Sequence, residues 1–243
     1  MRSVMATRLS GHTERALAKV SRTFPGGTEH DTQGAERMSG TTIEPAWSRT
    51  DRAKAAAKLM LGWVALLWVL EAVDYATGHA LDQYGVVARE PDTLPGVVTG
   101  SFLHFGFDHV ASNSVPLLVL GFIAALSGIR RFLAVCGIII VAEGLGTWLT
   151  SPPNTMTLGA SGVVFGLFGY LLVRGFVERK VLGVAVSLAI AAYWGTTMLT
   201  GILPVHEGIS WQGHLCGLVA GIATAVCHRR PARTRPAGPQ LTA

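Results

Sequence analysis

The chain has 243 residues, of which 49% are hydrophobic and only 14% are charged, with a formal net charge of +5. Soluble domains carry about 25% charged residues, so this composition excludes a disordered chain and is not typical of a soluble enzyme. The basic residues lie at the chain ends and in short clusters between long apolar runs, which disfavours a nucleic-acid partner. We therefore expect an all-α membrane protein that lies in a lipid bilayer.

Residues 1–58 are polar and contain no apolar run long enough to cross a bilayer. We expect them to form a disordered, basic cytoplasmic tail. The first 24 residues carry five basic side chains and one acid, a composition that also fits an amphipathic transit peptide. Met38 is an alternative start, since nothing before it is needed for a fold.

Six apolar segments follow, and most approach the ~20 residues that a helix needs to cross a bilayer. They are Leu59–Thr77, Phe107–Ser127, Phe132–Leu149, Ala160–Val173, Val181–Thr200 and Ser210–Cys227. The sequence therefore predicts a six-helix transmembrane bundle over residues 59–227, with a basic cytoplasmic C-terminal tail over residues 228–243.

The basic residues predict the orientation of this bundle. Of the 20 Lys and Arg residues, 19 fall on one side of the six-span map, and Arg89 is the exception. Cytoplasmic loops carry such an excess. Both termini are therefore expected in the cytoplasm, and the bacterial plasma membrane is favoured over an organelle.

The fourth segment is short. Ser161 and Arg174 are 13 residues apart, or about 20 Å in a helix, whereas the hydrocarbon core is about 30 Å thick. If Arg174 marks the cytoplasmic edge, Ser161 lies on the order of 10 Å below the outer surface. A helix that begins there exposes unpaired N–H groups, which only protein or a water-filled cavity can cover. The spacing predicts a buried aqueous site at Ser161.

Polar residues stand near the outer ends of the three segments that run from outside to inside: His109 and Asn113, then Ser161, then His214. Ionisable groups at membrane depth are costly and usually functional. His109 and Asn113 are four residues apart and share one helix face.

Glycines at GxxxG spacing accompany these polar residues, at positions 162 and 166 and at positions 213, 217 and 221. Such glycines let helix backbones approach closely. A short serine needs that approach to reach a histidine on another helix. The pattern favours Ser161 and His214 as a nucleophile–base pair, with His109 and Asn113 as hydrogen-bond donors nearby.

Three motifs resemble those of the rhomboid proteases, the intramembrane serine proteases: Gly159-Ala160-Ser161-Gly162, His104…His109…Asn113, and His214 followed by Gly217 and Gly221. The resemblance covers residues 59–227. It implies a rhomboid-like bundle in which Ser161 is the nucleophile and His214 the general base. The Ser161 backbone N–H, His109 and Asn113 would form the oxyanion hole.

The resemblance also implies a hydrolase, a serine endopeptidase that cleaves in or near transmembrane segments of membrane-protein substrates, with no metal or cofactor and a site open to the outer side. Two positions depart from the family pattern. Many members carry a Trp-Arg pair in the first outer loop, where this chain reads Leu94-Pro95-Gly96-Val97-Val98. The residue four after the serine is often tyrosine and is here Phe165, which can stack on the base but has no hydroxyl.

Three other functions are compatible with parts of the pattern. A proteolytically inactive relative that binds membrane clients would share the fold. A small-solute transporter would be expected to show internal repeats and polar groups in the cytoplasmic half. A zinc site of His104, His109 and His214 would lack the usual His-Glu-x-x-His motif.

Four further expectations concern single residues. His104 should brace the start of the 107–127 helix, and Glu143 should face a polar cavity or a partner side chain. Glu71 and Asp74 should lie at the membrane interface. The three cysteines, Cys136, Cys216 and Cys227, should behave as small buried hydrophobes.

Overall fold

The computed structural model describes residues 48–205 and 208–227 of the chain. The expected C-terminal tail, the transit-peptide alternative, the alternative start at Met38 and all but the last eleven residues of the expected N-terminal tail lie outside the described residues.

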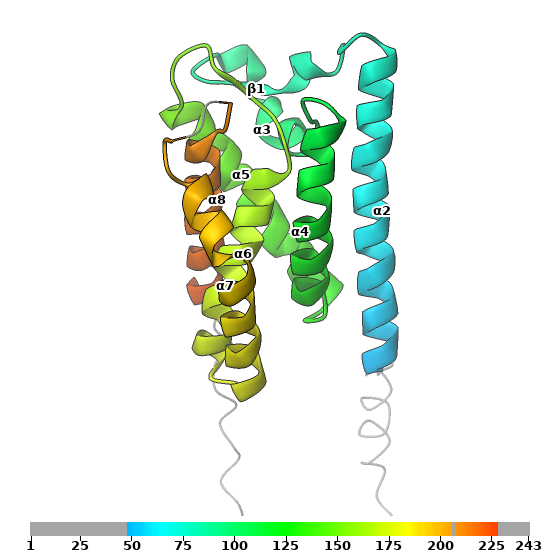
Figure 1. The fold of residues 1–243 in the computed structure, drawn as a ribbon, viewed down its shortest axis with the longest axis vertical. Helices are drawn as coiled ribbons and strands as arrows, with labels where there is room; N and C mark the ends of the chain where they lie inside the picture. Colours follow the sequence, from blue (N-terminus) through cyan, green and yellow to red (C-terminus); the bar gives the residue numbers. More distant parts are fainter. Residues whose placement is uncertain (1–47, 206–207, 228–243) are drawn as a thin grey trace, which may run out of the picture. The chain divides into compact units, whose positions relative to one another are not determined.

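Six long helices make up the bundle (Figure 1): α2 (Arg49–Ala76), α4 (Phe107–Ala125), α5 (Ile129–Thr150), α6 (Ser161–Glu178), α7 (Val181–Gly201) and α8 (Trp211–Cys227). Within the described part of the chain, the first five are long and apolar enough to cross a membrane, and α8 is apolar with 17 residues. The predicted six-helix membrane fold is confirmed.

Two helices extend beyond their apolar segments. Helix α2 begins at Arg49, ten residues before the predicted Leu59, because residues 49–58 are rich in Ala, Lys and Arg, which favour helix. The Ser48 hydroxyl caps this start by accepting from the Asp51 N–H at 3.1 Å. Helix α6 continues five residues past Val173 to Glu178.

The polar end of α6 is held by ion pairs. The Glu178 carboxylate accepts from Arg174 at 2.9 Å, from Arg131 at 3.0 Å and from Lys180 at 3.0 Å. Arg131 belongs to α5, so the pairs also tie α5 to α6. Hydropathy locates the bilayer, whereas caps and ion pairs decide where these helices begin and end.

Helix α6 lies at the centre of the bundle and packs against α4, α5, α7 and α8. Its approach to α8 depends on glycines. A Cβ atom on Gly217 would collide with the carbonyl oxygen of Gly162, and one on Gly221 with that of Gly166. The predicted close contact between the helices that carry Ser161 and His214 is therefore present.

The loop between α2 and α4, residues 77–106, folds over one end of the bundle. The basic residues predict that this end is the outer one, so the loop is called the first outer loop. It contains four short helical turns and a strand: η2 (Asp82–Tyr84), β1 (Val86–Val87), η3 (Pro91–Thr93), α3 (Gly96–Thr99) and η4 (Gly100–Phe102). Strand β1 pairs antiparallel with β2 (Met156–Thr157), and the Gly100 carbonyl accepts from the Gly159 N–H at 2.8 Å. Backbone pairing thus lets this loop hold the segment before Ser161, although the Trp-Arg pair is missing.

Glu71 and Asp74 lie in the last two turns of α2, and both are buried, with 2% of each residue exposed. Their expected place at the membrane interface stays a prediction. The two residues are three positions apart and share one face of α2, which is buried in the protein. Asp74 accepts from the Leu81 N–H at 2.7 Å and contacts His79 Nδ1 at 2.9 Å, which closes the end of α2. The cysteines differ from one another: Cys136 is buried as expected, but Cys216 is partly exposed and Cys227 exposed.

Candidate active site

Ser161 is the first residue of α6, and Ala160 is the N-cap. Figure 1 shows that α6 begins below the outer ends of α2 and α5, after an extended segment that descends from the outer loops. The first N–H groups of a helix have no intrahelical partner and carry its positive dipole end. The Ser161 hydroxyl therefore lies at a helix terminus that favours a developing negative charge.

His214 lies in the first turn of α8, with 8% of the residue exposed. Its Nε2 is 2.8 Å from the Ser161 hydroxyl, and its Nδ1 is 2.8 Å from the Gly201 carbonyl oxygen. A carbonyl oxygen can only accept, so Nδ1 carries the proton and Nε2 accepts from the serine O–H. This tautomer is the one that a general base requires.

Gly201 is the last residue of α7, so its carbonyl is one of those that a helix end leaves unpaired. Gly201 was not predicted from the sequence as part of the site. The available signal was a glycine that ends an apolar helix three residues before Pro204.

Phe165 stacks on the His214 ring, as expected, with 4.0 Å between the ring centroids and an interplanar angle of 9°. It follows Ser161 by one helical turn. A Cβ atom on Gly201 would lie 2.6 Å from Phe165 Cζ, so this ring and the Gly201 backbone fill the space around the imidazole. The His214 ring is thus fixed on one face by Phe165 and at Nδ1 by Gly201.

His109 lies beside the segment that leads to the serine. Gly159 has φ +134°, a conformation that favours glycine, and a Cβ atom there would lie 2.8 Å from His109 Nε2. His109 Nδ1 accepts from the Phe105 N–H at 3.4 Å, which leaves the proton on Nε2. A donor therefore stands next to the residue two positions before Ser161.

Asn113 is buried, with 5% of the residue exposed. Its amide donates to the His109 carbonyl at 3.1 Å, one turn earlier on α4. An amide has two N–H groups, so one remains for another acceptor. The structure brings Ser161 and His214 into direct contact, places His109 against Gly159, and gives Asn113 a bond to its own helix.

His104 contacts the start of α4, as expected: its ring meets the His109 ring edge-on, with 5.0 Å between the centroids. His104 also reaches α6. Its buried ring accepts at Nε2 from the Ala160 N–H at 3.2 Å and thereby holds the start of α6. Burial, together with neighbouring His109, lowers the pKa of His104 from 6.5 to about 3. The ring is therefore neutral at physiological pH and can accept this bond.

Glu143 of α5 is buried against a partner side chain, as expected. Its Oε1 accepts from the Ser101 hydroxyl at 2.8 Å, and a Cβ atom on Gly162 would lie 2.6 Å from its Cδ. Because the Gly201 carbonyl occupies His214 Nδ1, Glu143 does not complete a triad. It connects α5 to the first outer loop beneath the start of α6.

The three histidines of the zinc alternative are engaged differently. His214 has both ring nitrogens in contact with Ser161 and Gly201, and His104 Nε2 is occupied by the Ala160 N–H. Within the described part of the chain, the converging group of metal-ligand side chains is Asp74, His79 and Asp82, at the end of α2. That group is separate from Ser161.

Comparison with known proteins agrees with this architecture. A family model of the Rhomboid domain matches residues 91–231, and the chain belongs to the rhomboid family. It is a multi-pass integral membrane protein with a rhomboid domain.

The chain is similar to several bacterial proteins. An uncharacterized protein of Mycobacterium bovis is 38% identical over 201 residues, which cover 79% of this chain and 81% of the relative. One of Mycobacterium leprae is 35% identical over 206 residues, 82% of this chain and 81% of the relative. YdcA of Bacillus subtilis, whose name assigns it provisionally to the rhomboid proteases, is 28% identical over 172 residues, 67% of this chain and 82% of the relative.

Proposed function

We propose that the protein is an intramembrane serine endopeptidase that hydrolyses peptide bonds in or near transmembrane segments of other membrane proteins, with Ser161 as nucleophile and His214 as base. The observation that carries the proposal is the 2.8 Å contact from Ser161 to His214 Nε2, together with the Gly201 carbonyl that fixes the imidazole tautomer. Family membership supports the same reaction class.

The reaction follows from this geometry. His214 Nε2 takes the proton of the Ser161 hydroxyl as the oxygen attacks the peptide carbonyl carbon. The imidazolium then gives that proton to the leaving amine, which leaves an acyl group on Ser161. Water, deprotonated by the same nitrogen, releases the acid and restores the serine.

The Gly201 carbonyl takes the place of a carboxylate in orienting the base. It accepts from Nδ1–H throughout, and the bond strengthens when the ring becomes charged, since charge-assisted hydrogen bonds are about twice as strong as neutral ones. The C-terminus of α7 also carries the negative end of the helix dipole, which stabilises a nearby cation by about 0.3–1 kcal/mol. A serine–histidine dyad therefore needs no acidic third member.

The negative oxygen that forms during attack needs donors. The Ser161 backbone N–H at the start of α6, the Nε2–H of His109 and the second amide N–H of Asn113 are the proposed oxyanion hole. Each such donor contributes about 10²–10³ in rate in other serine hydrolases.

The proposal includes an orientation. With both termini in the cytoplasm, as the 19 basic residues on one side favour, the Ser161 site opens toward the outer side of a bacterial plasma membrane. Substrates would then present their scissile bonds near the outer ends of their spans.

The test is cleavage of a panel of tagged single-span membrane proteins by the purified wild type, with Ser161→Ala as the matched control. Products that appear with the wild type alone support the protease. If no substrate in the panel is cut, and client proteins co-purify equally with both forms, the inactive client-binding alternative takes its place.

A further inference from the structure

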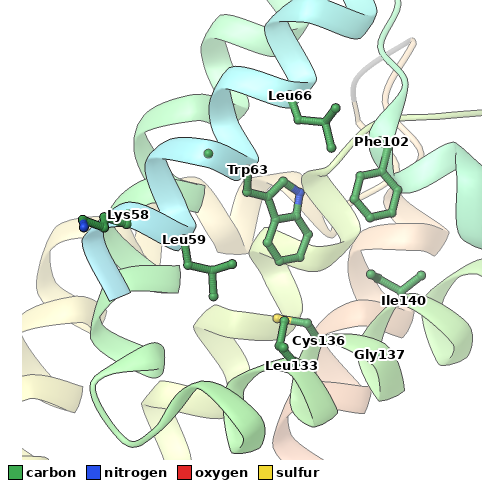
Figure 2. Close-up of a pocket in the computed structure, with 10 residues that line it drawn as sticks. Lys58, Leu59, Trp63, Leu66, Phe102, Leu133, Cys136, Gly137 and Ile140 are labelled. Carbon is green, nitrogen blue, oxygen red and sulfur yellow. The ribbon is translucent and has the colours of Figure 1, made fainter. Parts of the chain in front are cut away.

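A groove of about 510 Å³ lies between α2 and α5 and is separate from the Ser161–His214 pair. This volume falls in the range of about 300–1,000 Å³ that is typical of ligand sites. Figure 2 shows Leu59, Trp63 and Leu66 of α2 facing Leu133 and Ile140 of α5 across it. The walls are almost wholly apolar.

The groove is preformed by rigid aromatic packing. The Trp63 ring stacks on Phe102 at 5.7 Å and meets the edge of Phe132 at 6.1 Å, and these contacts hold the Trp63 side of the wall in place. Gly62 and Gly137 line opposite sides, and a Cβ atom on either would meet nothing within 4 Å. Because glycine has no side chain, these two positions leave space in the groove.

The length of the groove matches one leaflet of the bilayer. Lys58 and Leu66 lie eight residues apart on α2, which corresponds to about 12 Å along a helix. Half of the ~30 Å hydrocarbon core is about 15 Å. An acyl chain in one leaflet is therefore long enough to extend along the whole groove.

One end of the groove is basic. Lys58 lines it, Lys54 precedes Lys58 by one turn of α2, and Arg130 precedes Leu133 by one turn of α5; all three cations are exposed. Arg131, by contrast, is already paired with Glu178. Exposed cations at the membrane surface attract anionic headgroups.

We propose that this groove is a binding site for an anionic glycerophospholipid, with one acyl chain between α2 and α5 and the headgroup phosphate at Lys58. Charge complementarity at Lys58 and the one-leaflet length of the apolar walls favour this occupant over a second copy of the chain or a substrate helix. The site is independent of proteolysis, and its test does not require an active enzyme.

The test is native mass spectrometry of the full-length protein with added phosphatidylglycerol or phosphatidylcholine that carry the same acyl chains. Lys58→Gln should weaken phosphatidylglycerol binding about fivefold, the equivalent of roughly 1 kcal/mol, and leave phosphatidylcholine binding unchanged. Gly62→Leu and Gly137→Leu should each remove the bound lipid by filling the groove. Gly195→Leu on α7, where a Cβ atom also meets nothing within 4 Å, is the matched control and should retain it.

Three results would overturn the proposal. The first is equal lipid binding by Gly62→Leu and Gly195→Leu. The second is equal retention of the two lipids by the wild type. The third is a groove variant that abolishes a dimer without changing lipid binding, which would assign the surface to a second copy. Melting temperatures establish that each variant is folded, and the surface change Lys58→Gln keeps the test decisive if a leucine variant fails to fold.

Discussion

Replacing Gly201 with alanine tests the least expected part of the site. The new Cβ atom would lie 2.6 Å from Phe165 Cζ and 3.4 Å from His214 Nδ1. Carbon atoms prefer about 3.5–4.0 Å, so Phe165 or the end of α7 must move by about 1 Å. Either movement disturbs the stacked imidazole and its 2.8 Å bond to the Gly201 carbonyl.

The expected loss follows from that bond. A hydrogen bond to a charged group contributes about 1.5–3 kcal/mol, and the imidazole is charged in the transition state. We therefore expect kcat/KM of Gly201→Ala to fall about 10–100-fold. The ratio of kcat/KM between variant and wild type is obtained from initial rates of cleavage of a tagged single-span substrate, measured with purified protein in vesicles.

Two companion variants make this measurement decisive. Gly195→Ala lies on the same helix, where a Cβ atom meets nothing within 4 Å, and should keep wild-type activity. Phe165→Leu combined with Gly201→Ala should recover part of the lost rate, because the shorter side chain removes the nearest clash. Full activity in Gly201→Ala would refute the role given to this carbonyl. An unchanged melting temperature shows that a loss of activity is not a loss of the fold.

Three further predictions concern the proposed oxyanion-hole donors on α4, the His104 ring that holds the start of α6, and residues 1–37. His109→Ala and Asn113→Ala should lower kcat more than they raise KM, because the N–H groups of these residues donate to an oxygen that is charged only in the transition state. The rates are measured over a range of substrate concentrations. An unchanged kcat in both variants would show that α4 contributes no donor to the oxyanion hole. Because the pKa of His104 is about 3 in the fold against 6.5 in the unfolded chain, the unfolded chain binds the extra proton between these values and stability should fall as pH drops below about 6.5. His104→Gln, which can still accept a hydrogen bond, should flatten that slope in melting curves from pH 4 to 7; an identical slope would contradict the assignment. Deletion of residues 1–37 should leave the specific activity unchanged, and a loss in protein that still inserts would make the tail part of the enzyme.

The sequence predicted the transmembrane helices well, because each one requires a continuous run of apolar residues, and such a run can be recognised without knowing the rest of the fold. It missed the start of α2 at Arg49 and the end of α6 at Glu178, where a cap and ion pairs rather than apolar residues set the boundary. The sequence also did not show that the helix face shared by Glu71 and Asp74 is buried in the protein.

The candidate site was predictable where side chains with characteristic chemistry form motifs. Ser161, His214, His109 and Asn113 are of this kind. The partners of the histidine rings were not predictable, since the Gly201 carbonyl and the Ala160 N–H are backbone groups that any sequence contains. Which of them meets a ring depends on how α6, α7 and α8 approach one another.

The central claim is that His214 activates Ser161, and covalent labelling with a fluorophosphonate tests it without knowledge of the substrate. Mass spectrometry of the labelled wild type should locate the phosphonyl group on Ser161, and Ser161→Ala should take up none. His214→Ala should label far more slowly, because the serine O–H then has no base at 2.8 Å. Label on another residue, or equal labelling of Ser161 in the wild type and in a folded His214→Ala protein, would contradict the serine–histidine mechanism.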